Sequence, residues 1–143
     1  MEPMSEVRCF LLVPVDGEQR LDARQLYRRA DGEPGEWTLA DAPPGAMWYC
    51  EWMRGCEGGP WMGGDPPDGW LAVRLPNGHD WMPDTRARNC TMPEDNAHRC
   101  WVREGEPPNV TVTKNGPTCG AGAGSIGSGS YHGFLRGGVL IGD

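Results

Sequence analysis

The stretch that decides how this chain folds runs from Asn89 to Phe134 and reads NCTMPEDNAHRCWVREGEPPNVTVTKNGPTCGAGAGSIGSGSYHGF. It holds three of the six cysteines and two of the three histidines of the chain: Cys90, Cys100, Cys119, His98 and His132. Residues 119–130 are built almost wholly of glycine, alanine and serine. The other segments read as short strands that hold this stretch in place, so we expect any metal binding or chemistry to occur here.

The composition indicates one small, turn-rich folded domain. Glycine (22) and proline (14) make up about a quarter of the 143 residues, yet seven tryptophans are available to build a core. A chain of this length suffices for one core. We expect a polar tail at residues 1–6 and a single β-rich domain at residues 7–143. The net charge of −7 argues against nucleic-acid binding, which relies on neutralising phosphates.

The chain shows neither a signal peptide nor a membrane span. The apolar run Cys9-Phe-Leu-Leu-Val-Pro-Val15 is short and contains Pro14. No apolar run approaches the roughly 20 residues of a membrane helix. We therefore expect no secretion through a signal peptide and a reducing compartment. In such a compartment, cysteines are read as metal ligands or buried thiols before disulfides.

Turn signals divide the chain into short strands and hairpins. The expected strands are residues 7–13, 25–30, 36–40, 46–53, 70–75, 79–82, 100–103, 109–113, 131–135 and 139–141. Asp31–Gly35 and Asn77-Gly78 are expected to close hairpins. Thr91-Met-Pro-Glu94 matches a capping box and predicts one helical turn ending near His98. The connections look too short for parallel crossovers, so the prediction is a mostly β fold of short antiparallel strands with long Gly/Pro-rich loops.

The thiols and imidazoles of the deciding stretch form the main candidate site. Cys90, His98, Cys100, Cys119 and His132 offer the donor types that tetrahedral zinc prefers. The short segment 91–97 could bring Cys90 back beside Cys100. The spacing contains no paired Cys-x-x-Cys, so buried thiols, or a disulfide between Cys90 and Cys100, remain open.

Two other constellations stay open as alternatives. Cys50, Cys56 and His79, with Cys9 as a possible fourth member, could form a second metal set, or the cysteines could be packed free thiols. Cys119 with His132 or His98 could act as a nucleophile and base, although the sequence shows no third, orienting residue.

The glycine run is predicted to be a loop, formed by Gly120, Gly122, Gly124, Ser125 and Ile126 with their neighbours. Residues 122–127 match the dinucleotide fingerprint G-x-G-x-x-G, but no apolar strand precedes them and no helix follows. Ordering so many glycines is entropically costly, so the loop should be mobile or pinned at both ends. We expect Cys119 and His132 to approach within ligand distance of each other, and Ile126 to anchor the loop on the core.

Several motifs carry a resemblance to a known group of proteins. They are Pro44-Gly-Ala-Met-Trp48, Asn89-Cys-Thr91, His98-Arg-Cys-Trp-Val-Arg103, Gly105-Glu-Pro-Pro-Asn-Val-Thr-Val112, Cys119-Gly-Ala-Gly-Ala-Gly-Ser-Ile126 and Tyr131-His-Gly-Phe-Leu135. In these motifs the chain resembles small phage and prophage proteins of unknown function that are often labelled "ammonia monooxygenase". The resemblance covers about the last two-thirds of the chain and implies phage origin and a shared site at the five Cys and His residues. The enzymatic label implies little, because ammonia oxidation needs copper in a membrane-bound assembly.

These observations lead to one expected function and one rival. We expect a non-catalytic, phage-encoded interaction or structural module, associated with the virion or acting on a host component and stabilised by a Cys/His site for zinc. Its partner would be a protein of the virion or host, met in the host cytoplasm or the virion, with neither nucleic acid nor membrane involved. The rival is a small metal- or cysteine-dependent hydrolase that uses Cys119 and His132.

Overall fold

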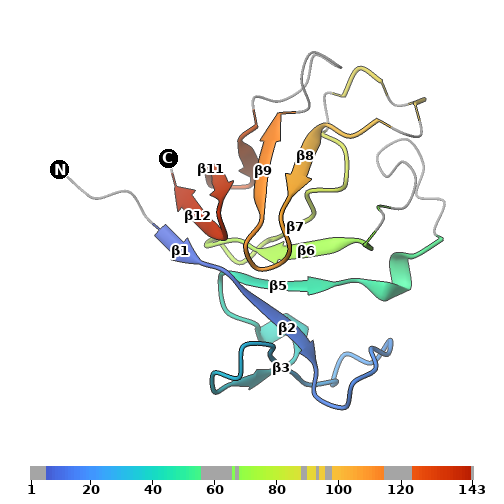
Figure 1. Ribbon diagram of the computed structural model, residues 1–143, viewed down its shortest axis with the longest axis vertical. Coiled ribbons are helices and arrows are strands. Elements are labelled where there is room, and N and C mark those ends of the chain that lie inside the picture. Colours follow the sequence, from blue (N-terminus) through green and yellow to red (C-terminus); the bar gives the residue numbers. More distant parts are fainter. Residues whose placement is uncertain are drawn as a thin grey trace.

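The fold is almost wholly β. The computed structural model describes residues 6–55, 66, 68–87, 90–92, 94–95, 98–114 and 124–142 (Figure 1). Its strands are β1 (Glu6–Arg8), β2 (Phe10–Pro14), β3 (Tyr27–Arg29), β4 (Glu36–Trp37), β5 (Ala46–Tyr49), β6 (Leu71–Arg74), β7 (Asp80–Trp81), β8 (Trp101–Glu104), β9 (Thr111–Lys114), β10 (Ile126–Ser128), β11 (Tyr131–Arg136) and β12 (Val139–Gly142). Two 3-10 helices, η1 (Leu39–Asp41) and η2 (Glu51–Met53), complete the described elements. The predicted fold class, mostly β with short antiparallel strands, is confirmed.

The strands form three sheets. The largest has the order β4-β3-β2-β5-β6-β7, the second has the order β1-β12-β11-β10, and the third is the β8-β9 hairpin. Pairing is antiparallel throughout these sheets except between β2 and β5, which run parallel. Our expectation that no parallel pair would form is therefore wrong at this one place. The connection between the two strands, residues 15–45, is long because it contains the whole β3-β4 hairpin and η1.

The first strand of the chain changes sheets at Cys9. The sequence predicted one strand over residues 7–13, whereas β1 pairs with β12 and β2 pairs with β3 and β5. At the crossing, the Cys9 N–H donates to the Gly138 carbonyl (2.8 Å) and the Phe10 N–H donates to the Gly45 carbonyl (3.1 Å). Gly45 has φ +94°, and a Cβ there would lie 2.7 Å from the Arg8 carbonyl oxygen, so only glycine allows this close approach.

The β5-β6 pair is buried on both faces and separates two hydrophobic clusters. Along these strands, Met47 pairs with Val73 and Trp48 pairs with Ala72. Because side chains alternate along a strand, these two pairs point to opposite faces of the sheet. The first cluster consists of Cys9, Met47, Leu71, Val73, Leu75, Trp81, Cys100, Trp101, Val110, Val112, Ile126, Tyr131, Leu135 and Leu140. The second cluster consists of Phe10, Leu12, Tyr27, Ala42, Ala46, Trp48, Cys50, Trp70 and Ala72.

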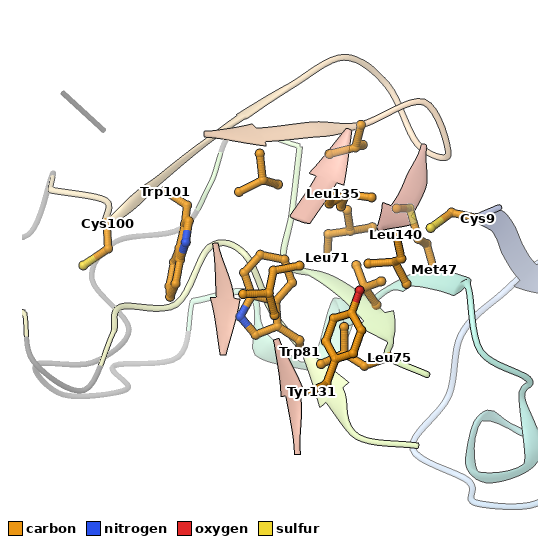
Figure 2. Packing of buried hydrophobic residues seen from close by; sticks show 14 residues of the cluster. Cys9, Met47, Leu71, Leu75, Trp81, Cys100, Trp101, Tyr131, Leu135 and Leu140 are labelled. Carbon is orange, nitrogen blue, oxygen red and sulfur yellow. The ribbon is translucent and has the colours of Figure 1, made fainter. Parts of the chain in front are cut away.

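The β8-β9 hairpin and the four-stranded sheet close over the first cluster (Figure 2). Trp101 of β8 meets Trp81 of β7 edge to face, with ring centroids 5.3 Å apart. The Gly138 N–H donates to the Val110 carbonyl (3.0 Å) and so ties the β11-β12 turn to the hairpin. The start of β8, where the candidate metal ligands lie, is therefore packed directly on the core.

Three local expectations differ from the structure. The expected strand over 46–53 ends at Tyr49, and η2 follows it. The described residues of the Thr91–Glu94 segment are not helical; instead the Asp95 N–H donates to the Met92 carbonyl and the His98 N–H donates to the Asp95 carbonyl. Such a short segment cannot repay the cost of helix nucleation, and these two backbone hydrogen bonds form instead. The end of the glycine run forms β10, paired with β11, where a loop was expected.

Two glycines of the β10-β11 pair provide a matched test of this packing. A Cβ on Gly133 would collide with the Ile141 carbonyl oxygen and with the ring of Tyr131, whereas a Cβ on Gly127 meets nothing within 4 Å. We expect Gly133→Ala to lower the free energy of unfolding by about 1–3 kcal/mol through overpacking. Gly127→Ala should leave it unchanged or raise it by up to about 1 kcal/mol. Urea denaturation of both variants measures the difference, and equal stabilities would contradict the packing described here.

Candidate metal centre

Three of the predicted ligands come together next to β8. Cys90 and His98 lie in the connection between β7 and β8, and Cys100 directly precedes β8. The Sγ atoms of the two cysteines and a ring nitrogen of His98 all lie within 4.8 Å of one another. His98 is 4% exposed and Cys100 is 3% exposed, while Cys90 is partly buried. This group could hold a metal ion.

The spacing of the donor atoms suits tetrahedral coordination. The Cys100 Sγ lies 3.7 Å from the His98 Nε2. Zinc binds cysteine sulfur at about 2.3 Å and histidine nitrogen at about 2.0–2.1 Å, so tetrahedral angles place the two donor atoms about 3.6 Å apart. The observed distance between these two atoms is close to that value.

Backbone amides stabilise both sulfurs. The Ala87 N–H donates to the Cys100 Sγ, and the Met92 N–H donates to the Cys90 Sγ, both at 3.4 Å. Hydrogen bonds donated to a thiolate favour the charged form, which is the form that binds a metal. The loop thus supplies the contacts outside the ligands that orient such a site.

Further hydrogen bonds and core packing hold the loop that carries Cys90 in place. The Arg86 side chain, which is 6% exposed, donates to the Asp95 carbonyl. The Cys90 N–H donates to the Ala87 carbonyl (3.1 Å), and the Cys90 side chain packs against the first cluster. The three donors are therefore held between core packing on one side and loop hydrogen bonds on the other.

An ion-pair network anchors β8 beyond the candidate ligands. The Arg103 guanidinium donates to both oxygens of Asp84 (3.0 and 3.1 Å) and to both oxygens of Asp68 (2.6 and 2.7 Å). The side chains of Arg103 and Asp84 are 8% and 7% exposed, and the Asp84 Oδ2 also accepts the Leu71 N–H (3.3 Å). This network joins β8 to β6, and its members went unnoticed in the sequence because they are far apart along the chain.

Each carboxylate of the network supports the charge of the guanidinium. Burial disfavours the charged form of Arg103, but the Asp68 and Asp84 carboxylates outweigh it and raise the pKa of Arg103. Burial also works against the Asp68 carboxylate, yet the Arg103 hydrogen bonds and charge hold the pKa of Asp68 below its ordinary value. Burial and the Asp68 hydrogen bond raise the pKa of Tyr49 to about 12, so this phenol stays a hydrogen-bond donor.

The remaining predicted site residues are placed as follows. Cys119, Gly120 and Gly122 lie outside the described residues, so the expected approach of Cys119 to His132 stays a prediction. His132 lies on the exposed face of β11 and is not a member of the three-residue group.

The end of the glycine run, in contrast, reaches β8, next to the candidate ligand Cys100. The Ser125 carbonyl accepts the indole N–H of Trp101 (3.2 Å), and Trp101 directly follows Cys100. Gly124 has φ +82°, and Ile126 is fully buried in the first cluster, as expected of an anchor.

The second cysteine set does not gather in the described part of the chain. Cys9 belongs to the first cluster and Cys50 to the second. Burial raises the pKa of each thiol to about 12, so both are neutral packed thiols at physiological pH. His79 lies near Ser128, with Nδ1 3.4 Å from the Ser128 Oγ, and Cys56 lies outside the described residues.

Comparisons with known proteins add no family assignment. No protein-family model matches the chain, and no curated protein or solved structure matches it. Neither short helix in the described part of the chain has the length and apolar character needed to cross a membrane.

The Arg103 network yields a stability prediction. Arg103→Met would leave the buried Asp84 carboxylate without its cation, and we expect a loss of about 3–5 kcal/mol in the free energy of unfolding. Arg24→Met is the matched control, because the Arg24 side chain is 91% exposed in its pair with Asp22 and should change stability by no more than about 1 kcal/mol.

The same network makes the free energy of unfolding depend on pH. Because the folded pKa of Asp68 is depressed, its contribution is present above the ordinary carboxyl pKa of about 3.9 and is lost as pH falls through the folded pKa. Part of the acid-induced loss of stability should therefore disappear in Arg103→Met. Denaturation curves at pH 7 and pH 3 measure both effects, and equal behaviour of the two arginine variants would rule out the structural role of the network.

Proposed function

We propose that the protein is a phage-encoded, non-catalytic interaction module whose Cys90, His98 and Cys100 bind one structural zinc ion. The observation that carries the metal assignment is the convergence of these three donors, with both sulfurs already accepting backbone N–H groups. Two thiolates and an imidazole suit zinc better than calcium or magnesium, which prefer oxygen ligands.

The charge of the site favours a divalent cation. Two thiolates balance the +2 charge of zinc, and His98 binds as a neutral imidazole. The fourth position would take Cys119, which the sequence places after β9, or a water molecule. Cys119, as a third thiolate and fourth ligand, would close the site, as in structural zinc centres, whereas a water would leave it open.

The ion would have a mechanical role in this fold. The connection from Cys90 to Cys100 contains neither a helix nor a strand in its described residues. A metal bound by both ends of this connection would hold it against β8 and the first cluster. Since the site is not preformed in an unfolded chain, the binding free energy would add to folding stability.

Zinc analysis tests the metal assignment. Protein purified without chelators should release about one zinc per chain on denaturation, and chelation should lower the unfolding temperature. Cys100→Ser should lose most of the metal, whereas Cys50→Ser should retain it, because the Cys50 thiol is neutral and lies in the other cluster. Metal-free wild-type protein, or equal zinc content in the two variants, would refute the assignment.

The proposed phage origin and interaction role are supported by the sequence and not by the geometry of the candidate metal centre. The resemblance to phage and prophage proteins supports the origin, and the acidic charge supports a protein partner over nucleic acid. The host cytoplasm or the virion would be the site of action. The hydrolase alternative stays a prediction, because it requires Cys119.

Mass spectrometry of purified virions distinguishes a component of the virion from a factor that acts on the host. A copy number comparable to that of known structural proteins would indicate a virion component. Recovery only from infected or induced cells, together with a host protein, would indicate a factor that acts on the host. Turnover of a hydrolase substrate that is lost in Cys119→Ala would overturn the non-catalytic assignment.

A further inference from the structure

The two sulfurs of the candidate metal centre lie close enough to bond to each other. The Sγ atoms of Cys90 and Cys100 belong to a group of donor atoms that all lie within 4.8 Å of one another, and both residues are in the thiol form. A disulfide bond is about 2.05 Å long, so the two sulfurs would have to approach by less than about 3 Å. A change of one side-chain rotamer moves a cysteine sulfur by about that distance. The pair is therefore within reach of a disulfide as well as of a metal ion.

Only one of the two cysteines needs to move. Cys100 is 3% exposed and directly precedes β8, which packs on the first cluster (Figure 2). Cys90 lies in the connection before β8, and the described residues of this connection form neither a helix nor a strand. A shift of Cys90 toward Cys100 therefore breaks no pairing between strands. The bond would close a short loop of the chain and leave the sheets intact.

Cys90 is also the described cysteine that an oxidant reaches most easily. It is partly buried, whereas Cys9, Cys50 and Cys100 are 4%, 5% and 3% exposed. The Cys90 Sγ accepts the Met92 N–H (3.4 Å), which favours the thiolate, the form that reacts with oxidants. Burial raises the pKa of the Cys9 and Cys50 thiols to about 12, so both stay neutral and unreactive. Among the described cysteines, oxidation should therefore begin at Cys90.

Oxidation by hydrogen peroxide gives the disulfide in two steps. The Cys90 thiolate attacks one peroxide oxygen; an S–O bond forms, the O–O bond breaks and hydroxide leaves. The Cys100 thiolate then attacks the Cys90 sulfur; the S–S bond forms, the S–O bond breaks and a second hydroxide leaves. The two sulfurs together lose two electrons, and the peroxide gains them.

Metal binding and the disulfide exclude each other, because they use the same two sulfurs. Loss of both thiolates leaves His98 as the only donor of the three-residue group, which is too few to retain an ion. Either cross-link, however, fastens the connection from Cys90 to Cys100 at the start of β8. A reducing compartment favours the thiols and hence the metal, whereas the oxidising exterior of a cell favours the disulfide.

We propose that Cys90 and Cys100 are a redox-active pair, whose disulfide replaces the metal ion in holding this connection when the protein passes from a reducing to an oxidising environment. The inference rests on the proposed function for the zinc of the reduced state and for the change of environment. A component made in the host cytoplasm and carried by a virion meets both conditions. The disulfide itself requires only the two sulfurs.

Peptide mapping of the oxidised protein tests the proposal. Trypsin cuts after Arg88, Arg99 and Arg103. The two cysteines then lie on separate peptides, residues 89–99 and 100–103. Treatment of zinc-loaded protein with hydrogen peroxide, followed by alkylation of the remaining thiols, should link these two peptides in most chains and release about one zinc per chain. Dithiothreitol should separate the peptides and restore zinc binding.

Single cysteine variants and thermal unfolding complete the test. Cys50→Ser is the matched control and should form the same link, as should Cys119→Ala, whereas Cys90→Ser should abolish it. The unfolding temperature of the oxidised, metal-free protein should exceed that of the reduced, metal-free protein, because the disulfide holds the connection. Equal unfolding temperatures would show that the bond does not take over the role of the ion, and would overturn the proposal.

The outcomes for the disulfide and for zinc are independent. Zinc-loaded protein in which peroxide leaves the two peptides unlinked, or links either of them to another cysteine, would overturn the redox pair and leave the zinc assignment intact. A link between the two peptides in protein that never contained zinc would support the redox pair and refute the zinc assignment.

Discussion

The constraint on which the structure depends is the burial of the β5-β6 pair on both faces. Met47 and Val73 face the first cluster, while Trp48 and Ala72 face the second. A pair of strands without a polar face must be covered twice. The β8-β9 hairpin and the four-stranded sheet cover one face, and the β2-β3-β4 segment with η1 covers the other. The sheet change at Cys9 follows from this requirement, since one short segment must join both coverings.

Local signals predicted the hairpins well, because a hairpin depends on neighbouring residues only. The turns at Asp31–Gly35 and Asn77-Gly78 carry Gly residues at positive φ, as the sequence indicates. The parallel pairing of β2 with β5 could not be predicted, because it joins segments separated by a complete hairpin. β10 was missed for a related reason: its glycine-rich sequence has low β propensity, and pairing with β11 and burial of Ile126 decide its structure.

At the candidate metal centre, too, contacts between residues near in sequence could be predicted, whereas long-range contacts could not. Cys90, His98 and Cys100 are close in sequence, so a short loop was enough to predict their contact. The Arg103 network joins residues 19 and 35 positions apart, and no pattern in the sequence indicates which carboxylates an arginine will reach. A buried arginine with two carboxylates stabilises a fold only if all its partners are in place. The tertiary structure must therefore be formed before this interaction can be recognised.

The two faces of β5-β6 also determine how the two sites can influence each other. The candidate metal centre packs against the first cluster, and a pocket lined by Leu21, Trp48 and Trp52 is built on the second. Contributions from sites without shared contacts add independently, so a metal ion would stabilise the fold without changing the pocket. The shared element is β6: the Leu71 N–H bonds Asp84 in the Arg103 network, and Arg74 pairs with Asp80 at the pocket. A bound ligand shifts an equilibrium only through contacts that differ between two states. Because β6 is buried along its whole length and held at both ends, it has little freedom to adopt a second state, so it would not transmit a change from the candidate metal centre to the pocket.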